Sequence, residues 1–280
     1  MSSTAKEQFL PDDHCDWGTV RSHIARYAFA SRFVGGKSCL DIACGMGYGS
    51  AYLKKSGARM VVGGDASPAA VKAAVASHRT PDLQFTLVDA QRLPFNDESF
   101  DVVVSMETIE HLPHPEQFFR ECRRVLKPKG MLVCSTPNRR IYTQKNPRRE
   151  SPFNPFHMSP YHIREFDVTE FQSLVGGARL QSEAVYGQDF LNRNLSWKAQ
   201  NFAFWLTRRV VLSLPRGQSL RRFGKRHVVN NPDSPASEWF KQLDVMEEEG
   251  LSALSKDITP FPVGRDSREP ANIILVARKQ

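Results

Sequence analysis

Residues 39–49 read CLDIACGMGYG, a short apolar run that contains one acid and then breaks into a glycine-rich turn. This pattern predicts a buried strand that feeds a ligand-binding loop. Gly45, Gly47 and Gly49 let the backbone take positive φ and come close to a ligand. Their spacing is G-x-G-x-G, with Asp41 ahead of them, whereas a dinucleotide fingerprint reads G-x-G-x-x-G. The loop therefore differs from that of the dinucleotide-binding folds.

Further apolar runs follow at regular intervals, and most of them end in polar residues. Residues 59–65 end at Asp65, where a doubly wound sheet presents a carboxylate to a ribose diol. Residues 83–90 end in Asp89 and Ala90, and residues 100–105 precede Met106. These positions predict a ligand site along one edge of a sheet.

The glycine loop and the acids after it resemble the motifs of class I S-adenosylmethionine (SAM) methyltransferases, whose cofactor has an amino-acid end and no pyrophosphate. The resemblance implies SAM as the cofactor, with Asp65 on the ribose hydroxyls and Asp89 and Ala90 beside the adenine. The full set of cofactor contacts that we expect is Asp41, Ala43, Gly45, Gly47, Asp65, Ala66, Asp89, Ala90 and Met106.

Strand-like runs alternate with helix-like stretches such as residues 115–126 and 168–174, which indicates a parallel sheet with right-handed crossovers. Residues 271–278 predict a last strand, antiparallel if the chain keeps the methyltransferase pattern. We therefore expect an α/β protein with a Rossmann-like, seven-stranded SAM methyltransferase sheet and helices on both faces. A helical basic insertion is expected before the last strand.

Four segments are predicted along the chain. Residues 1–38 form an N-terminal arm and helix that cover the cofactor, and residues 39–188 form the SAM-binding core. Residues 189–266 form a basic and aromatic insertion, which is a lid or a contact for the acceptor or a membrane. Residues 267–280 return to the core as its last strand.

The length and the cysteines point to one α/β domain in a reducing compartment. The chain has 280 residues and five scattered cysteines with no C-x-x-C pair. Residues 1–10 lack the features of a signal peptide, and no run approaches the roughly 20 apolar residues that span a bilayer. We expect a cytoplasmic protein, and peripheral association with the inner face of the membrane stays open.

Positive charge is concentrated in residues 190–226, which carry nine Lys and Arg residues and no acid. The whole chain is +8, so the remainder sums to −1. Trp197, Trp205 and several Phe and Leu residues lie in the same segment. Three interpretations stay open: a lid over the active site with solvated arginines, contact with a membrane or a lipid-linked substrate, and nucleic-acid binding.

Glu107, Glu110 and His111 stand at i, i+3 and i+4, so one helical turn would project all three side chains from one face. Two carboxylates and an imidazole can bind a divalent cation such as Mg²⁺ or Mn²⁺. The alternative is a solvated turn with a helix-capping acid.

Two further resemblances bear on this cluster. The Glu-x-x-Glu-His pattern with a later histidine resembles metal-dependent small-RNA 2′-O-methyltransferases, which implies His162 as the fourth ligand, with His157 as a substitute. The same pattern and residues 135–139 also look like the ubiquinone-pathway O-methyltransferases. The predicted metal ligands are Glu107, Glu110, His111 and His162.

Residues 9–12, 26–30, 41–49 and 154–157 together look like SAM methyltransferases encoded with bacterial glycan-biosynthesis enzymes. All three groups of relatives act on hydroxyls, so we expect O-methylation of a small or lipid-linked acceptor such as a sugar or quinol. The predicted catalytic residues are His111, His157 and Glu110, and His14 is another candidate base. Methylation of an RNA terminus and SAM binding without turnover are the alternatives.

Overall fold

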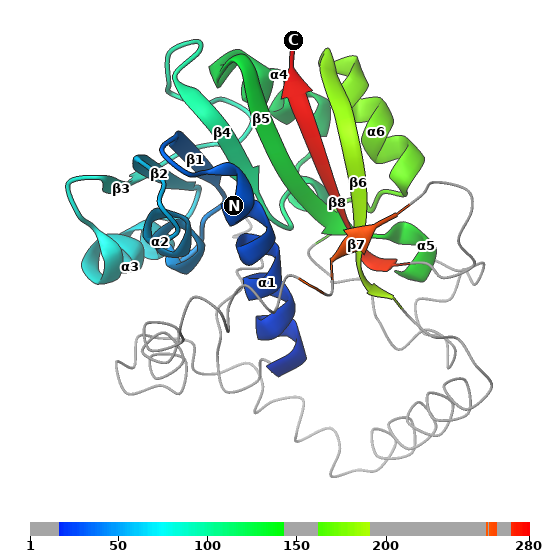
Figure 1. The fold of residues 1–280 in the computed structure, drawn as a ribbon, viewed down its shortest axis with the longest axis horizontal. Helices are drawn as coiled ribbons and strands as arrows, with labels where there is room; N and C mark the ends of the chain where they lie inside the picture. The colour runs from blue at the N-terminus through cyan, green and yellow to red at the C-terminus, as the bar shows by residue number, and fades with distance from the viewer. Residues whose placement is uncertain (1–16, 143–161, 191–255, 257, 262–269) are drawn as a thin grey trace, which may run out of the picture.

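The computed structural model of the protein describes residues 17–142, 162–190, 256, 258–261 and 270–280. Within this part of the chain, one sheet of eight strands has the order β3-β2-β1-β4-β5-β8-β6-β7 (Figure 1). The strands are β1 Ser38–Ile42, β2 Met60–Asp65, β3 Leu83–Leu87, β4 Phe100–Ser105, β5 Leu126–Pro137, β6 Leu180–Phe190, β7 Thr259–Pro260 and β8 Pro270–Lys279.

Strands β1 to β5 pair in parallel, whereas β8 runs antiparallel to both β5 and β6. This arrangement confirms the predicted α/β class, the mostly parallel sheet and the antiparallel last strand. The sheet has one strand more than the seven expected, because the two-residue β7 pairs with β6 at its edge.

Helices cover both faces of the sheet, as expected (Figure 1). The helices are α1 Trp17–Ala30, α2 Tyr48–Lys55, α3 Pro68–His78, α4 Pro115–Val125, α5 Arg139–Tyr142 and α6 Val168–Gly177, with short 3₁₀ helices η1 Ser31–Phe33 and η2 Ile109–His111. Side chains of β5 alternate between the two faces: Leu132 and Cys134 belong to the core with α4 and α6, while Met131 and Val133 belong to the core with α1 and α2. The buried runs of the sequence thus form a sheet that is covered on both sides.

Local sequence signals explain where several helices begin. Ser67 caps α3, because its Oγ accepts a hydrogen bond from the backbone N–H of Ala70, and Pro68 occupies the first turn. Asp167 and Glu170 form a reciprocal capping box at the start of α6. These caps fix the helices that follow β2 and precede β6.

The described cysteines Cys39, Cys44, Cys122 and Cys134 are buried and free, and they pack as small apolar groups. None of the described helices has the length and apolar character needed to cross a bilayer.

Candidate functional site

The candidate site lies along the edge of the sheet where the parallel strands end. The strand order reverses between β1 and β4, and open α/β sheets bind ligands outside the carboxyl ends of their strands at such a switch point. The ends of these two strands are joined directly, because Ser105 Oγ donates a hydrogen bond to the carbonyl of Ile42 over 3.2 Å. The residues that follow β1 and β4 therefore face the same region.

The glycine-rich loop after β1 has the predicted left-handed backbone at Gly45 and Gly47, whereas Gly49 lies within α2 and has no positive φ. Ala43, Gly45 and Gly47 have φ values of 60°, 55° and 85°. A Cβ placed on Gly45 would meet no atom within 4 Å, so its backbone faces open space, whereas one on Gly47 would lie 2.6 Å from the Phe85 ring. Gly45 therefore leaves room for a ligand, and Gly47 is required by packing.

Asp65 at the end of β2 holds this loop. Its Oδ2 accepts a hydrogen bond from the backbone N–H of Gly45 over 2.9 Å, and its Oδ1 accepts one from the N–H of Ser67 over 2.8 Å. The carboxylate is partly exposed, so it retains acceptor capacity toward a ligand. Its role on a ribose stays a prediction.

Asp41 lies beneath the loop rather than on its surface. Its carboxyl is fully buried and accepts hydrogen bonds from Tyr27 Oη over 3.2 Å and from Ser50 Oγ over 2.6 Å. Burial raises the pKa of Asp41 to about 7, although these two hydrogen bonds oppose the shift. In this structure Asp41 ties α1 and α2 to the loop, and a direct contact with a cofactor stays a prediction.

The other predicted cofactor residues lie along the same strand ends. Ala66 and Asp89 are exposed, while Ala90 and Met106 are buried. Asp89 Oδ1 accepts a hydrogen bond from the N–H of Gln91, which closes the turn after β3. All four lie beyond the ends of β2, β3 and β4, as the sequence indicates.

The structure corrects the predicted helical turn of Glu107, Glu110 and His111. Glu107 has a φ of 51°, and the 3₁₀ helix η2 begins only at Ile109, so the three side chains do not share one helical face. The carboxylate of Glu107 instead accepts a hydrogen bond from Ser135 Oγ over 2.7 Å. Glu107 therefore does not lie in one group with Glu110 and His111.

Glu107 belongs to a buried network that reaches α1 and β8. Arg26 Nε lies 4.0 Å from Glu107 Oε1, and Arg26 is only 2% exposed. Asn272, in the orientation that satisfies its amide, donates to Glu107 Oε2 over 3.3 Å and accepts from Arg26 over 3.2 Å. Arg26 also donates to Gln188 Oε1 over 2.8 Å. Glu107 thus has a cation and two hydrogen-bond donors around it.

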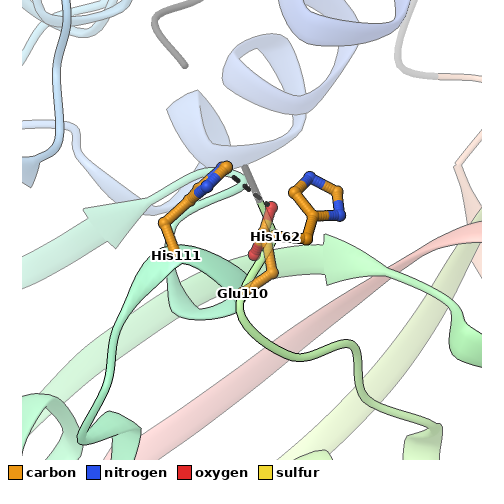
Figure 2. A group of neighbouring side chains, drawn as sticks. All are labelled: Glu110, His111 and His162. Carbon is orange, nitrogen blue, oxygen red and sulfur yellow. Dashed lines mark ion pairs between the residues drawn. The ribbon is translucent and has the colours of Figure 1, made fainter. Parts of the chain in front are cut away.

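Glu110, His111 and His162 form a second group, shown in Figure 2. One candidate ligand atom of each lies within 4.8 Å of the others. Glu110 is fully buried, Thr136 Oγ1 donates to its Oε2 over 3.0 Å, and its Oε1 has no hydrogen-bond partner. His111 Nε2 lies 3.9 Å from that oxygen. Burial, and secondarily the nearby charge of Glu107, raises the pKa of Glu110 well above its ordinary value.

The backbone brings His162 to this group from a distant part of the chain. The N–H groups of Ile163 and Arg164 both donate to the carbonyl of Glu110, over 2.8 and 3.2 Å. The rings of His111 and His162 pack edge to face, with centroids 4.9 Å apart. Three of the four predicted metal ligands therefore converge, and Glu107 does not.

The donor set of this group fits a divalent cation. An unpaired buried carboxylate oxygen beside two imidazoles matches transition ions such as Mn²⁺ better than Mg²⁺, which prefers oxygen ligands. His14, His157 and residues 191–255 lie outside the described residues, so the structure does not place those candidate bases or the basic segment.

The site contains residues that sequence reasoning did not assign. Arg26 and Tyr27 belong to a stretch that carries a resemblance, Asn272 lies in the predicted last strand, and no role at the site is predicted for any of them or for Gln188. Their signal is a polar residue inside an otherwise apolar run, as at Arg26 in α1 and Asn272 in β8. A polar residue is buried only where it has hydrogen-bond partners. Its position in an apolar run therefore predicts a buried polar network, but it does not say which other residues belong to that network.

Residues 40–134 match the family model of a methyltransferase domain. A protein of Mycolicibacterium smegmatis named "Probable S-adenosylmethionine-dependent methyltransferase" is 36% identical over 167 residues, which cover 60% of this chain and 61% of that one. The phthiotriol/phenolphthiotriol dimycocerosates methyltransferase of Mycobacterium tuberculosis is 41% identical over 113 residues, 39% of this chain and 42% of that one. The chain thus spans about three fifths or less of these relatives' length.

Solved structures share the fold at low sequence identity. The SAM-dependent methyltransferase from Mesorhizobium loti has a TM-score of 0.51 and 16% identity, covering 89% of this chain and 95% of that one. The [4+2]-cyclase SpnF has a TM-score of 0.55 and 18% identity, covering 98% and 88%. The fold is the Rossmann-like fold that solved SAM-dependent methyltransferases also have, and part of the chain is similar in sequence to such proteins.

Proposed function

We propose that this protein transfers a methyl group from SAM to a hydroxyl of a small or lipid-linked acceptor, such as a sugar, a glycan or a quinol-like compound. One juxtaposition carries the proposal. The open backbone of Gly45, braced by Asp65, lies at the same sheet edge as the buried Glu110, and Ser105 links the two through its hydrogen bonds to Ile42 and to Thr108. A cofactor loop and a polar acceptor side thus adjoin.

The reaction is a displacement at the methyl carbon of the sulfonium. A bond forms between the acceptor oxygen and that carbon, the bond from carbon to sulfur breaks, and S-adenosylhomocysteine leaves. The hydroxyl proton passes to a base, and an imidazole titrates in the right range for this step. His111 is the base at the described site, and His157 or His14 takes that role if His111 holds a cation.

The second part of the proposal concerns the group of Glu110, His111 and His162, which would hold a Mn²⁺-like cation. Bound there, the cation supplies Lewis-acid chemistry toward a hydroxyl oxygen. Glu110 provides the anionic ligand, and Thr136 fixes its other oxygen. The unpaired Glu110 Oε1 supports this part, because a buried carboxylate oxygen without a partner is costly.

The acceptor is proposed to be apolar in part, because one relative is named for a lipid, dimycocerosate. The proposed contact of residues 190–226 with an anionic membrane surface and a cytoplasmic location rest on sequence alone. RNA-terminal 2′-O-methylation and SAM binding without turnover are the competing functions. The cyclase SpnF has the same fold, so methyl transfer does not follow from the fold itself.

Radiolabelled methyl transfer tests the proposal. The purified protein is incubated with methyl-labelled SAM and with separate lipid, polar and RNA extracts from the source organism lacking this gene. The proposal predicts label in the lipid or polar extract that resists alkaline treatment, as an ether does and an ester does not. Label confined to RNA would establish the competing reaction, and Glu110→Gln provides the inactive control.

A further inference from the structure

Glu165 is a buried carboxylate that neither the cofactor site nor the proposed cation site uses. Its side chain is about 1% exposed, and its Oε1 lies 3.0 Å from Nδ1 of His162. Its Oε2 is buried without a hydrogen-bond partner. A carboxylate in such surroundings is costly unless it binds something specific, and the described partner is the imidazole of His162.

The segment that carries Glu165 is fixed on both sides. On one side, the N–H groups of Ile163 and Arg164 donate to the carbonyl of Glu110. On the other, Phe166 is fully buried and its carbonyl accepts a hydrogen bond from the N–H of Arg139 over 2.9 Å, next to the end of β5. The backbone segment that carries both Glu165 and His162 is therefore hydrogen-bonded to Glu110.

A neutral imidazole carries one proton, and the hydrogen bond made by one nitrogen decides which nitrogen is left with its lone pair. A carboxylate at Nδ1 accepts an N–H from it, so Nε2 is left unprotonated. In water, neutral histidine prefers the opposite tautomer, with the proton on Nε2. The edge-to-face contact with His111 restrains the ring plane as well.

We propose that Glu165 is the positioning residue of His162: it accepts the Nδ1–H, fixes the ring, and leaves Nε2 as the nitrogen that serves the reaction site. The part of this inference in which Nε2 of His162 serves a cation or an acceptor rests on the proposed function. The tautomer itself does not depend on that function and can be observed directly. Carboxylates that hold a ligating imidazole in this way raise its basicity, and their loss typically costs about 10- to 100-fold in metal affinity.

The tautomer is measured by long-range ¹H–¹⁵N correlation spectra of the full chain, labelled with ¹⁵N and freed of metal by a chelator. The pH is kept above the ordinary pKa of histidine. The signals of His162 are identified by their loss in His162→Asn. The wild type is expected to show a protonated Nδ1 and an unprotonated Nε2. A proton on Nε2, alone or on both nitrogens, would overturn the inference.

Variants separate positioning from a general structural role. Glu165→Leu removes the acceptor and is expected to move the proton to Nε2, whereas Glu165→Gln keeps an acceptor oxygen and is expected to retain the proton on Nδ1. Arg164→Gln is the matched control, because that side chain is exposed and pairs with Glu170, and it should leave the tautomer unchanged. A Glu165→Leu spectrum identical to that of the wild type would contradict the proposal.

Titration with Mn²⁺ alone distinguishes this inference from the proposed cation site. If the wild type binds Mn²⁺, Glu165→Leu should bind roughly tenfold more weakly or worse. An unchanged affinity in that variant would overturn the positioning role. If the wild type binds no Mn²⁺ but shows the expected tautomer, the cation proposal fails while the role of Glu165 stands.

Discussion

Arg26 Nε on α1 lies 4.0 Å from Glu107 Oε1 just after β4, and this pair ties the N-terminal helix to the turn that follows β4. The guanidinium is 2% exposed, so its charge requires the carboxylate and the amides of Gln188 and Asn272. Glu107 has a positive φ, a backbone conformation that is uncommon for residues other than glycine. A strained residue held by a buried pair is typical of a functional turn.

Removal of Glu107 should destabilise the fold through Arg26. Glu107→Ala leaves a buried guanidinium without its counter-charge, a change that typically costs about 3–5 kcal/mol, and Glu107→Gln should cost less because it keeps an acceptor. Urea denaturation measures the difference. Glu116→Ala is the control, since that acid pairs with His114 on the surface. Equal stability of the Glu107→Ala and Glu116→Ala proteins would contradict the account of this pair.

Gly49 should not tolerate a methyl group. A Cβ there would lie 2.0 Å from the Tyr27 ring, so Gly49→Ala must displace the ring that hydrogen-bonds Asp41. Overpacking of this kind typically costs about 1–3 kcal/mol and here should also loosen α1 from the loop. At Gly35 a Cβ meets nothing within 4 Å, so Gly35→Ala is the matched control. Thermal melting that ranks the two variants alike would show that Tyr27 does not pack as described.

The pKa of Asp41 predicts a specific pH dependence of stability. Burial raises it from 3.8 to about 7, so between these values the folded protein keeps a proton that the unfolded chain has lost. The contribution of Asp41 is therefore full below about pH 4 and is lost as the pH rises through about 7. Relative to Asp41→Asn, which does not titrate, the wild type should lose roughly 3 kcal/mol between about pH 5 and pH 8. Urea denaturation curves at several pH values measure this, and parallel profiles for the two proteins would refute it.

The two acids after β4 should differ in cation binding. Glu110 lies with His111 and His162, whereas Glu107 is held by Ser135 and Arg26. Glu110→Gln should therefore weaken Mn²⁺ binding by roughly tenfold or more, while Glu107→Gln should change it little. Calorimetric titration with Mn²⁺ measures both. An equal loss of Mn²⁺ affinity in the two variants would show that Glu107 is a ligand as well. If the wild type binds no Mn²⁺, the proposed cation site is wrong.

Local patterns predict most of the fold. The run at 39–49 and the later apolar runs lie where the strands are found, because each has buried residues on both faces and ends in a polar or glycine turn. The extra strand β7 has two residues and no pattern of its own. It is a strand only because it pairs with β6, and the local sequence does not predict that pairing.

The site was harder to predict, because its contacts join distant parts of the chain. The i, i+3, i+4 spacing suggested one helical face, but a positive φ at Glu107 interrupts that turn, and φ at a glutamate has no sequence signature. Only a resemblance indicates His162, and it gives Glu165 no role, because backbone hydrogen bonds to Glu110 bring this segment to the site. The spacing of residues along the sequence does not predict such contacts between distant parts of the chain.

The central claim is that the edge formed by Gly45 and Asp65 is a SAM site, and calorimetric titration with SAM tests it most directly. We expect one saturable site that S-adenosylhomocysteine blocks. Asp65→Ala should weaken binding by roughly 1.5–3 kcal/mol, because it removes a charged acceptor, and Asp82→Asn, a surface acid near Lys54, should bind like the wild type. The absence of saturable binding by the wild type, or an unchanged affinity in a folded Asp65→Ala protein, would contradict it.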